Sequence, residues 1–255
     1  MDKTLSLLYH EITDEPSLTG FQRKKAFAYK HTKKEFFDHL KIYNKNLSFF
    51  NDVCQLDFSS KSILVTFDDG GKSNIFAANE LKKMGIIGHF FIVTSLIGRK
   101  GFLSANEIKK LHKQGHVIGS HSHTHPNVFN SLNRDKMIYE WAKSKEILEN
   151  IVKEKIICCS IPGGDSNLNA FQTAGEIGFD YVFSSDPSFY PVHVDNTTVI
   201  GRVSLKKGDS LKKINRIINF KGIFLEIVIR KIKVIIKLMI YPFYSKIHNK
   251  RNNVN

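Results

Sequence analysis

Two pairs of polar residues in this chain have the types and spacing of a metal-assisted hydrolytic site. The adjacent acids Asp68 and Asp69 end a short apolar run, and His121 and His125 follow later with i, i+4 spacing. Together they supply one carboxylate and two imidazole ligands for one metal ion, with a second carboxylate left over as a base. The combination predicts a metal-dependent hydrolase.

The number of ligands that a catalytic metal needs indicates separate roles for Asp68 and Asp69. Catalytic zinc sites use three protein ligands and keep a position open, and Asp69, His121 and His125 fit that count. If residues 121–125 are helical or tightly turned, both imidazoles lie on one side. Asp68 cannot easily share the ion in the orientation of Asp69, so we expect it to take a proton from the attacking water. Alone, an Asp-Asp pair is more often a turn or a Mg²⁺ site, and the combination with the histidines favours the hydrolase.

The elements that position these residues alternate between strand and helix. Apolar runs predict strands, cap residues and glycines bound the helices between them, and no repeats or low-complexity linkers interrupt the pattern. Such alternation predicts parallel βα units wound into a barrel, with the chemistry where the strands end. The expected strands are 5–9, 63–67, 89–93, 117–119, 156–161, 181–184 and 199–203, and the expected helices are 32–43, 74–84, 104–114, 134–152 and 168–177.

Composition favours one domain, with an unusual charge distribution. The chain has 255 residues, 42% of them hydrophobic, and a formal net charge of +14. Residues 206–255 hold thirteen Lys and Arg and two acids, a balance of +11 that points to an anionic partner. Three cysteines indicate no disulfide framework. We find neither a signal-peptide pattern nor an uncharged stretch long enough to span a bilayer, so we expect the catalytic part in the cytoplasm.

At this point the sequence resembles the polysaccharide deacetylases of the NodB-homology type, carbohydrate esterase family 4. The resemblance covers about residues 4–205 and rests on residues 66–70, Thr-Phe-Asp-Asp-Gly, and 121–125, His-Ser-His-Thr-His. It implies a distorted (β/α)₇ barrel and hydrolysis of N-acetyl, sometimes O-acetyl, groups on sugars. It also implies Asp68 as base and Asp69, His121 and His125 as ligands of one divalent metal. Zn²⁺ is the expected ion, although Co²⁺, Ni²⁺ or Mn²⁺ can accept this ligand set.

The third motif of that family differs here. Its usual form is Arg-x-Pro-Tyr/Phe-Gly, and residues 160–164 read Ser-Ile-Pro-Gly-Gly. Pro162 and Gly164 therefore occupy expected substrate-groove positions, and the backbone N–H of Gly163 can still help to hold the oxyanion. Because the arginine that orients the base is missing, we predict that Arg202, on a late strand, replaces it beside Asp68. The alternative for Arg202 is a surface or phosphate-binding role.

The general acid is expected near the N-terminus. The Leu-x-x-His motif that usually carries it is absent, but Leu8-Tyr9-His10 resembles the poly-N-acetylglucosamine deacetylases, in which this histidine precedes the Asp-Asp motif. That resemblance implies His10 as the acid, and the alternative is a histidine in a polar rim. His89, inside an apolar strand, is expected to be a hydrogen-bonded core residue.

The last part of the chain is expected to form a basic amphipathic tail, residues 211–255, after a deacetylase domain at 1–210. In the helix expected at 223–241, charged residues at 226, 230, 233 and 237 form a narrow stripe opposite a broad apolar face. Such a helix can lie on an anionic membrane through residues 219–248, or it can cover the barrel or a second copy. The basic residues are not interleaved with stacking aromatics, so we expect no nucleic-acid partner.

These observations predict a metal-dependent deacetylase that removes acetyl groups from N-acetylhexosamine in a polysaccharide or a lipid-linked glycan precursor. The expected location is cytoplasmic, at the inner face of the plasma membrane if the tail binds lipid. An O-acetyl esterase or another amide hydrolase could use the same site. A catalytically impaired glycan- or membrane-binding protein also remains open, because the third-motif arginine is missing.

Overall fold

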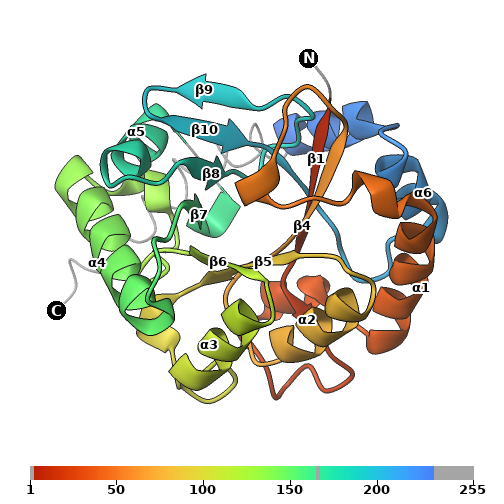
Figure 1. Cartoon of the computed structure of the whole chain (residues 1–255), viewed down its shortest axis with the longest axis horizontal. Helices are drawn as coiled ribbons and strands as arrows, with labels where there is room; N and C mark the ends of the chain where they lie inside the picture. Colours follow the sequence, from red (N-terminus) through yellow and green to blue (C-terminus); the bar gives the residue numbers. More distant parts are fainter. Residues whose placement is uncertain (1–2, 165–166, 233–255) are drawn as a thin grey trace, which may run out of the picture.

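A ring of parallel strands with helices outside forms the protein (Figure 1). The computed structural model describes residues 3–164 and 167–232. Parallel pairing runs through β1, β4, β5, β6, β7 and β8, and each strand follows its neighbour in the chain. The expected α/β barrel topology is confirmed. The strands of the ring are Thr4–Tyr9 (β1), Ser62–Phe67 (β4), Gly88–Ile92 (β5), Val117–Ser120 (β6), Cys158–Ser160 (β7), Tyr181–Phe183 (β8), Thr197–Ile200 (β10) and Arg202–Ser204 (β11).

The seventh side of the ring is one chain segment with two pairing partners. Strand β10 pairs in parallel with β8, and β11, which begins two residues later, pairs in parallel with β1. Gly201 lies between the two strands. The position has no room for a side chain, because a Cβ there would lie 2.4 Å from the Asp186 carbonyl oxygen. The single strand expected at 199–203 is therefore two strands. The break brings Arg202 into register with Ser6 of β1.

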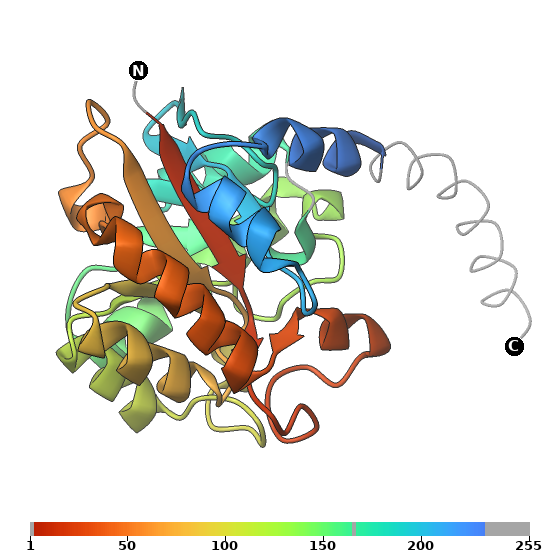
Figure 2. The ribbon, with the colours of Figure 1, turned by 90° about the vertical axis from the view of Figure 1, so that its right-hand side faces the viewer.

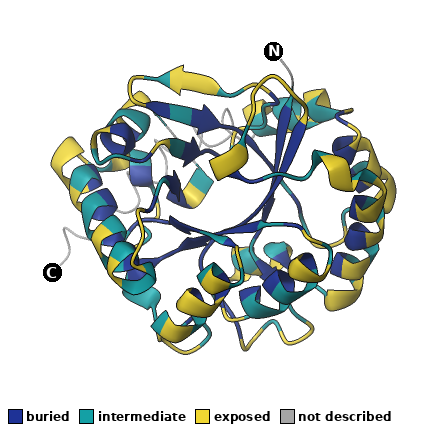
Figure 3. Ribbon diagram, viewed as in Figure 1, coloured by how far each residue is buried: buried dark blue, intermediate teal, exposed yellow. Residues whose placement is uncertain are grey.

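Helices cover the outer face of the strands, as the burial pattern shows (Figure 3). Their buried apolar side chains pack against the strands in the larger of two core clusters. The smaller cluster includes Leu64, Phe91, Phe183 and Ile200. The helices are Lys33–Tyr43 (α1), Asn74–Lys83 (α2), Ala105–Lys113 (α3), Arg134–Val152 (α4), Leu168–Glu176 (α5) and Leu211–Ile218 (α6).

Local sequence signals explain where the helices begin. Thr32 and Ser104 each form a complete capping box, with Glu35 and Glu107 three residues later. The long helix predicted at 134–152 is confirmed at both ends. Among the elements that the sequence patterns did not predict are the 3₁₀ helix Lys24–Tyr29 and the short strands Glu11–Ile12 (β2), Lys30–His31 (β3) and Val192–Val194 (β9).

The first part of the expected tail packs on the barrel. Helix α6 contacts α1, and Ile214, Ile217 and Ile218 belong to the main core (Figure 2). A further helical stretch covers residues 223–232, and the rest of the helix expected at 223–241 lies outside the described residues. Within the described ranges 3–164 and 167–232, no helix is both long and apolar enough to cross a bilayer.

The two residues of the expected charged stripe that the structure describes, Glu226 and Arg230, contact the rest of the protein. Glu226 pairs with Lys213 at 3.1 Å, and Arg230 pairs with Asp186 at 2.7 Å and donates to the carbonyl of Gly164. Apolar residues remain exposed on the same helix, with Phe224 exposed to 76% and Ile232 to 50%. Residues 223–232 therefore use their charges for packing and leave apolar surface uncovered.

Candidate active site

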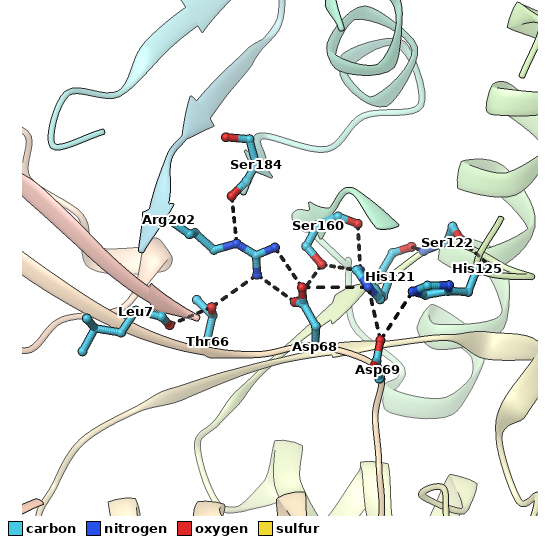
Figure 4. Close-up of polar contacts among 11 residues, drawn as sticks. Leu7, Thr66, Asp68, Asp69, His121, Ser122, His125, Ser160, Ser184 and Arg202 are labelled. Atoms are coloured by element: carbon cyan, nitrogen blue, oxygen red, sulfur yellow. Dashed lines mark hydrogen bonds and ion pairs between the residues drawn. The ribbon is translucent and has the colours of Figure 1, made fainter. Parts of the chain in front are cut away.

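Three of the predicted site residues converge at one point. The Asp69 Oδ1 atom lies 3.5 Å from Nε2 of His121 and 3.5 Å from Nε2 of His125 (Figure 4). One ligand atom from each residue lies within 4.8 Å of the other two. Asp69 follows β4, and both histidines follow β6, so the ends of two neighbouring strands bring them together.

Unusual backbone conformations aim these side chains. Asp69, Ser122 and His125 all have positive φ angles, of 76°, 62° and 56°. The Ser122 Oγ atom accepts a hydrogen bond from the backbone N–H of His125 at 3.1 Å. Of the two conformations expected for residues 121–125, the tight turn is therefore observed. Non-glycine residues rarely adopt such φ values, so their concentration here marks backbone strain held by the surrounding structure.

A side chain of helix α4 fixes the turn from outside. Both the backbone N–H and the hydroxyl of Thr124 donate to the Glu140 carboxylate, at 2.7 and 2.6 Å. The position of His125 thus depends on α4 as well as on β6.

The electrostatics of Asp69 and His125 suit a divalent cation. Burial favours the neutral form of Asp69, but His121, His10 and His125 outweigh it, and the pKa of this carboxyl lies below its usual range. Burial lowers the pKa of His125 to about 4. An ionised carboxylate and a neutral imidazole are the forms that bind metal, and the donor set of two nitrogens and one oxygen fits a catalytic zinc-type centre.

Asp68 lies beside this cluster and is held by Arg202. The guanidinium donates two hydrogen bonds to the carboxylate, from Nη1 to Oδ1 at 2.7 Å and from Nη2 to Oδ2 at 2.9 Å. Burial raises the pKa of Asp68, but Arg202 and His121 lower it more, so the carboxyl is held below its usual pKa. Figure 4 shows Asp68 between Arg202 and His121. Arg202 thus contacts Asp68 as predicted.

Arg202 is itself fixed on several sides. It is fully buried, its Nε donates to the Ser184 carbonyl at 3.0 Å, and Nη1 also lies 3.3 Å from the Thr66 hydroxyl. Its guanidinium lies over the rings of Phe91 and Phe183, at 5.6 and 5.9 Å from the ring centroids. A bidentate arginine in such a frame leaves the Asp68 carboxylate one orientation.

Ser160 completes the group, and sequence reasoning missed it. Its hydroxyl donates to Asp68 Oδ1 at 3.1 Å and lies 2.6 Å from Nδ1 of His121, whose Nδ1 is also 3.1 Å from the Ser160 carbonyl. The signal was present, because Ser160 occupies the third-motif position where an arginine was expected. A short hydroxyl at that position can contact both a base and a metal ligand, so the substitution supplies a contact as well as removing a charge.

A cavity of about 610 Å³ opens over these residues. Asp68 and the three clustered residues line it together with His10, Gly163 and Gly164. Pro162 is buried and Arg202 lies behind Asp68, so neither lines the cavity. Pro162 therefore does not reach the cavity as the predicted substrate contact, whereas the predicted site residues other than Pro162 and Arg202 all line it.

His10 stands at the wall of that cavity. Its ring packs on Tyr29, with the centroids 4.9 Å apart. Burial lowers the pKa of His10, and the carboxylates of Asp69 and Asp68 offset part of that effect. The Nδ1 atom has no hydrogen-bond partner among the described residues. The imidazole is thus positioned by packing, with both carboxylates close enough to favour its protonated form.

The two glycines of the third motif allow a close approach of loops. Gly163 has a φ of 73°, and a Cβ there would lie 2.8 Å from the Asn127 carbonyl oxygen. Gly164 has a φ of 76°, which also disfavours a side chain. The groove side chain that the resemblance implies has no room at Gly163.

Comparisons with known proteins agree with this fold. The family profile described as polysaccharide deacetylase matches residues 55–182. No curated protein matches the sequence. A polysaccharide deacetylase from Bacillus cereus, BC0361, has 21% identity and a TM-score of 0.70 over 85% of this chain and 69% of its own. IcaB from Ammonifex degensii has 20% identity and a TM-score of 0.68, over 86% and 97%. A de-N-acetylase from Aggregatibacter actinomycetemcomitans has 15% identity and a TM-score of 0.68, over 84% and 98%.

Proposed function

This chain belongs to the polysaccharide deacetylase family, and from this premise we propose that it hydrolyses the acetamide of N-acetylhexosamine residues in a polysaccharide or a lipid-linked glycan precursor. The observation that carries the proposal is the geometry of Asp68, which lies between a bidentate arginine and the three-residue cluster. The proposed products are acetate and a free amine.

In this proposal Asp69, His121 and His125 hold one divalent cation, with Zn²⁺ as the first candidate. When bound there, the ion supplies Lewis acidity, which polarises the acetyl carbonyl and makes water a stronger nucleophile. The Ser160 hydroxyl oxygen accepts a hydrogen bond from Nδ1–H of His121, which leaves Nε2 as the nitrogen that can bind the ion. The chain thus fixes the imidazole form that a metal requires.

Asp68 takes the proton from the attacking water. Its Oδ1 atom is occupied by Arg202 and Ser160, whereas Oδ2 has one bond from Arg202 and lies 3.8 Å from Nε2 of His121. We therefore assign Oδ2 as the accepting atom. Because its pKa is low, Asp68 is ionised at any pH at which the protein would be assayed.

His10 and Gly163 act on the other parts of the reacting group. The Gly163 backbone N–H would donate to the acetyl oxygen as negative charge develops on it. As the carbon–nitrogen bond breaks, the departing amine needs a proton, and His10 supplies it from the cavity wall. Burial lowers the pKa of His10, and Asp69 and Asp68 offset part of that effect, so the two carboxylates help to retain the proton that this step requires.

The proposal is tested by acetate release from N-acetylglucosamine oligomers, using purified protein with and without added Zn²⁺. We expect metal-stimulated release that Asp68→Asn reduces at least about 10²-fold. The matched control is Asp52→Asn, a buried acid outside the cavity that accepts a bond from the backbone of Cys54. An O-acetylated sugar run in parallel separates the amidase from an esterase. Bound metal without acetate release from any substrate would contradict the proposal.

We also propose that residues 219–248 bind an anionic membrane surface. The balance of +11 over residues 206–255 and the exposed side chains of Phe224, Leu225 and Ile232 support this assignment. Co-sedimentation with phosphatidylglycerol vesicles should occur at low salt and weaken in Phe224→Asp, while Phe58→Asp, an exposed aromatic elsewhere, leaves it intact. Equal sedimentation of the two variants would contradict membrane binding through this segment.

A further inference from the structure

The mouth of the active-site cavity carries an excess of positive charge, which an uncharged sugar would not neutralise. Among residues 3–164 and 167–232, six cations line it, together with two acids outside the catalytic pair, Asp209 and Glu226. The cations come from three places in the chain, which are the 3₁₀ helix near the N-terminus, the segment from the end of β11 to α6, and the last described helix. They are Arg23, Lys24, Lys25, Lys206, Lys213 and Arg230.

Both of those acids form ion pairs with the same lysine. The Lys213 ammonium lies 3.1 Å from Asp209 and 3.1 Å from Glu226. Arg230 is paired with Asp186 outside the cavity lining. The two acids of the mouth therefore do not neutralise the other lysines.

Three lysines remain for a ligand. Across residues 3–164 and 167–232, the ammonium groups of Lys24, Lys25 and Lys206 form no ion pair with a protein carboxylate. Lys24 and Lys25 are exposed, and Lys206 is half-buried. Like charges gathered at one concave mouth repel one another, so an anion that enters between them is attracted.

Arg23 links this group of lysines to the catalytic centre. Its guanidinium lies over the Phe21 ring, 4.5 Å from the centroid, and the Phe21 ring is 5.0 Å from the ring of His125. Its Nη1 atom donates to the Asn127 side chain at 2.7 Å, which fixes the guanidinium at the mouth. A single aromatic ring therefore separates this cation from a predicted metal ligand.

We infer that the mouth binds a phosphate or diphosphate on the anomeric carbon of the N-acetylhexosamine whose acetyl group is removed. This inference rests on the proposed function. In a 2-acetamido sugar the anomeric oxygen and the acetamide are on adjacent ring carbons, so a phosphate at the first lies beside the mouth when the second is at the cluster. Arginine and lysine are the residues that bind phosphate oxygens.

Such a phosphate reaches the site from a soluble nucleotide sugar or from a polyprenyl diphosphate. The last helix borders the same mouth, because Ile229 lines the cavity while 37% of its surface is exposed. Exposed apolar surface next to a phosphate site suits a lipid better than a nucleoside. The shared chemistry is the anomeric phosphate, and the experiment distinguishes the two sources.

The test compares kcat/KM for four substrates of the same sugar. They are a neutral N-acetylglucosamine oligomer, N-acetylglucosamine 1-phosphate, the uridine diphosphate sugar and a farnesyl diphosphate sugar. We expect at least a tenfold preference for the phosphorylated substrates over the oligomer, and Lys24→Gln/Lys25→Gln should reduce that preference at least fivefold. The control Lys109→Gln/Lys110→Gln removes two exposed lysines of α3, outside the cavity lining, and should leave the preference unchanged.

The outcomes test the phosphate inference and the proposed deacetylase function separately. Equal kcat/KM for neutral and phosphorylated substrates, or a preference that survives Lys24→Gln/Lys25→Gln, overturns the inference while leaving the deacetylase intact. If no substrate releases acetate, the proposed function fails. Titration calorimetry with N-acetylglucosamine 1-phosphate then decides on phosphate binding alone, which must weaken in Lys24→Gln/Lys25→Gln for the inference to hold. A farnesyl substrate better than the uridine one assigns the lipid source.

Discussion

Arg202 sets the charge state of the residue that we assign as the base. Burial alone raises the pKa of Asp68, and the guanidinium is the largest effect that lowers it again. Arg202 contacts Asp68 and does not line the cavity, so it is a positioning residue. Its removal should therefore change the pH dependence of the reaction as well as its rate.

We predict that Arg202→Met moves the acidic limb of the kcat/KM profile to higher pH. Without the guanidinium the buried carboxyl keeps its proton to higher pH, and activity falls about tenfold for each pH unit below the new pKa. Stopped assays between pH 5 and 9 measure the limb, and Arg202→Lys should restore part of the shift. A uniform loss of activity at every pH would mean that Arg202 has only a structural role.

Ser160 gives a second prediction at this scale. Ser160→Ala removes the hydroxyl that contacts both Asp68 and His121, so zinc affinity should fall about 10- to 100-fold, as for other residues that orient metal ligands. Competition with a chelating dye measures the affinity without reference to turnover. Thr173→Ala, another buried hydroxyl outside the site, should not change it. Unchanged zinc affinity in Ser160→Ala would refute the link between this hydroxyl and His121.

At the scale of elements, the sequence predicts what local patterns determine. The caps at Thr32 and Ser104 bound their helices, and the polar residues after β4 and β6 converge because parallel strands end at one edge. The split of β10 from β11 was not predicted, since it depends on the contact of Gly201 with the Asp186 carbonyl. Elements of two or three residues, such as β2 and β3, pair with each other through tertiary packing, so no periodic pattern indicates them.

Two core histidines join neighbouring elements as neutral groups. His89 accepts a hydrogen bond from the Val53 backbone N–H at Nε2, and its Nδ1 lies 3.0 Å from the Val65 carbonyl. His116 does the same between the Gly88 N–H and the Ala78 carbonyl. The expected hydrogen-bonded core role of His89 is confirmed. A second proton would remove the acceptor nitrogen from either bridge.

We therefore predict that the protein loses stability as pH falls from about 6.5 towards 4. Burial lowers the pKa of His89 and of His116 to about 4. The unfolded chain thus binds protons that the folded chain does not, at a cost of up to about 1.4 kcal/mol per pH unit for each group. Urea unfolding at pH 7.5 and 5.0 measures this slope. His89→Gln, whose amide can donate and accept without titrating, should flatten it, and His193→Gln at an exposed position should not. An unchanged slope in His89→Gln would show that other groups govern the acid limb.

At the scale of the whole molecule, closure of the ring depends on the segment from β10 to β11. We predict that Gly201→Ala destabilises the protein by about 1–3 kcal/mol, because the new Cβ would press against the Asp186 carbonyl and Ser188. Chemical denaturation measures the change. Gly175→Ala is the matched control, since its Cβ would meet Thr197 of the same segment at an ordinary 3.4 Å. A loss of equal size in both variants would contradict the closure argument.

The pairing of Asp68 with Arg202 also joins two residues that the ribosome makes far apart in time. The ribosome makes all three predicted metal ligands by residue 125, whereas the arginine that ionises the base is 134 positions beyond Asp68. A growing chain therefore holds every predicted metal ligand long before it holds the arginine that keeps the base ionised. Until residue 202 is made, Asp68 has no guanidinium partner.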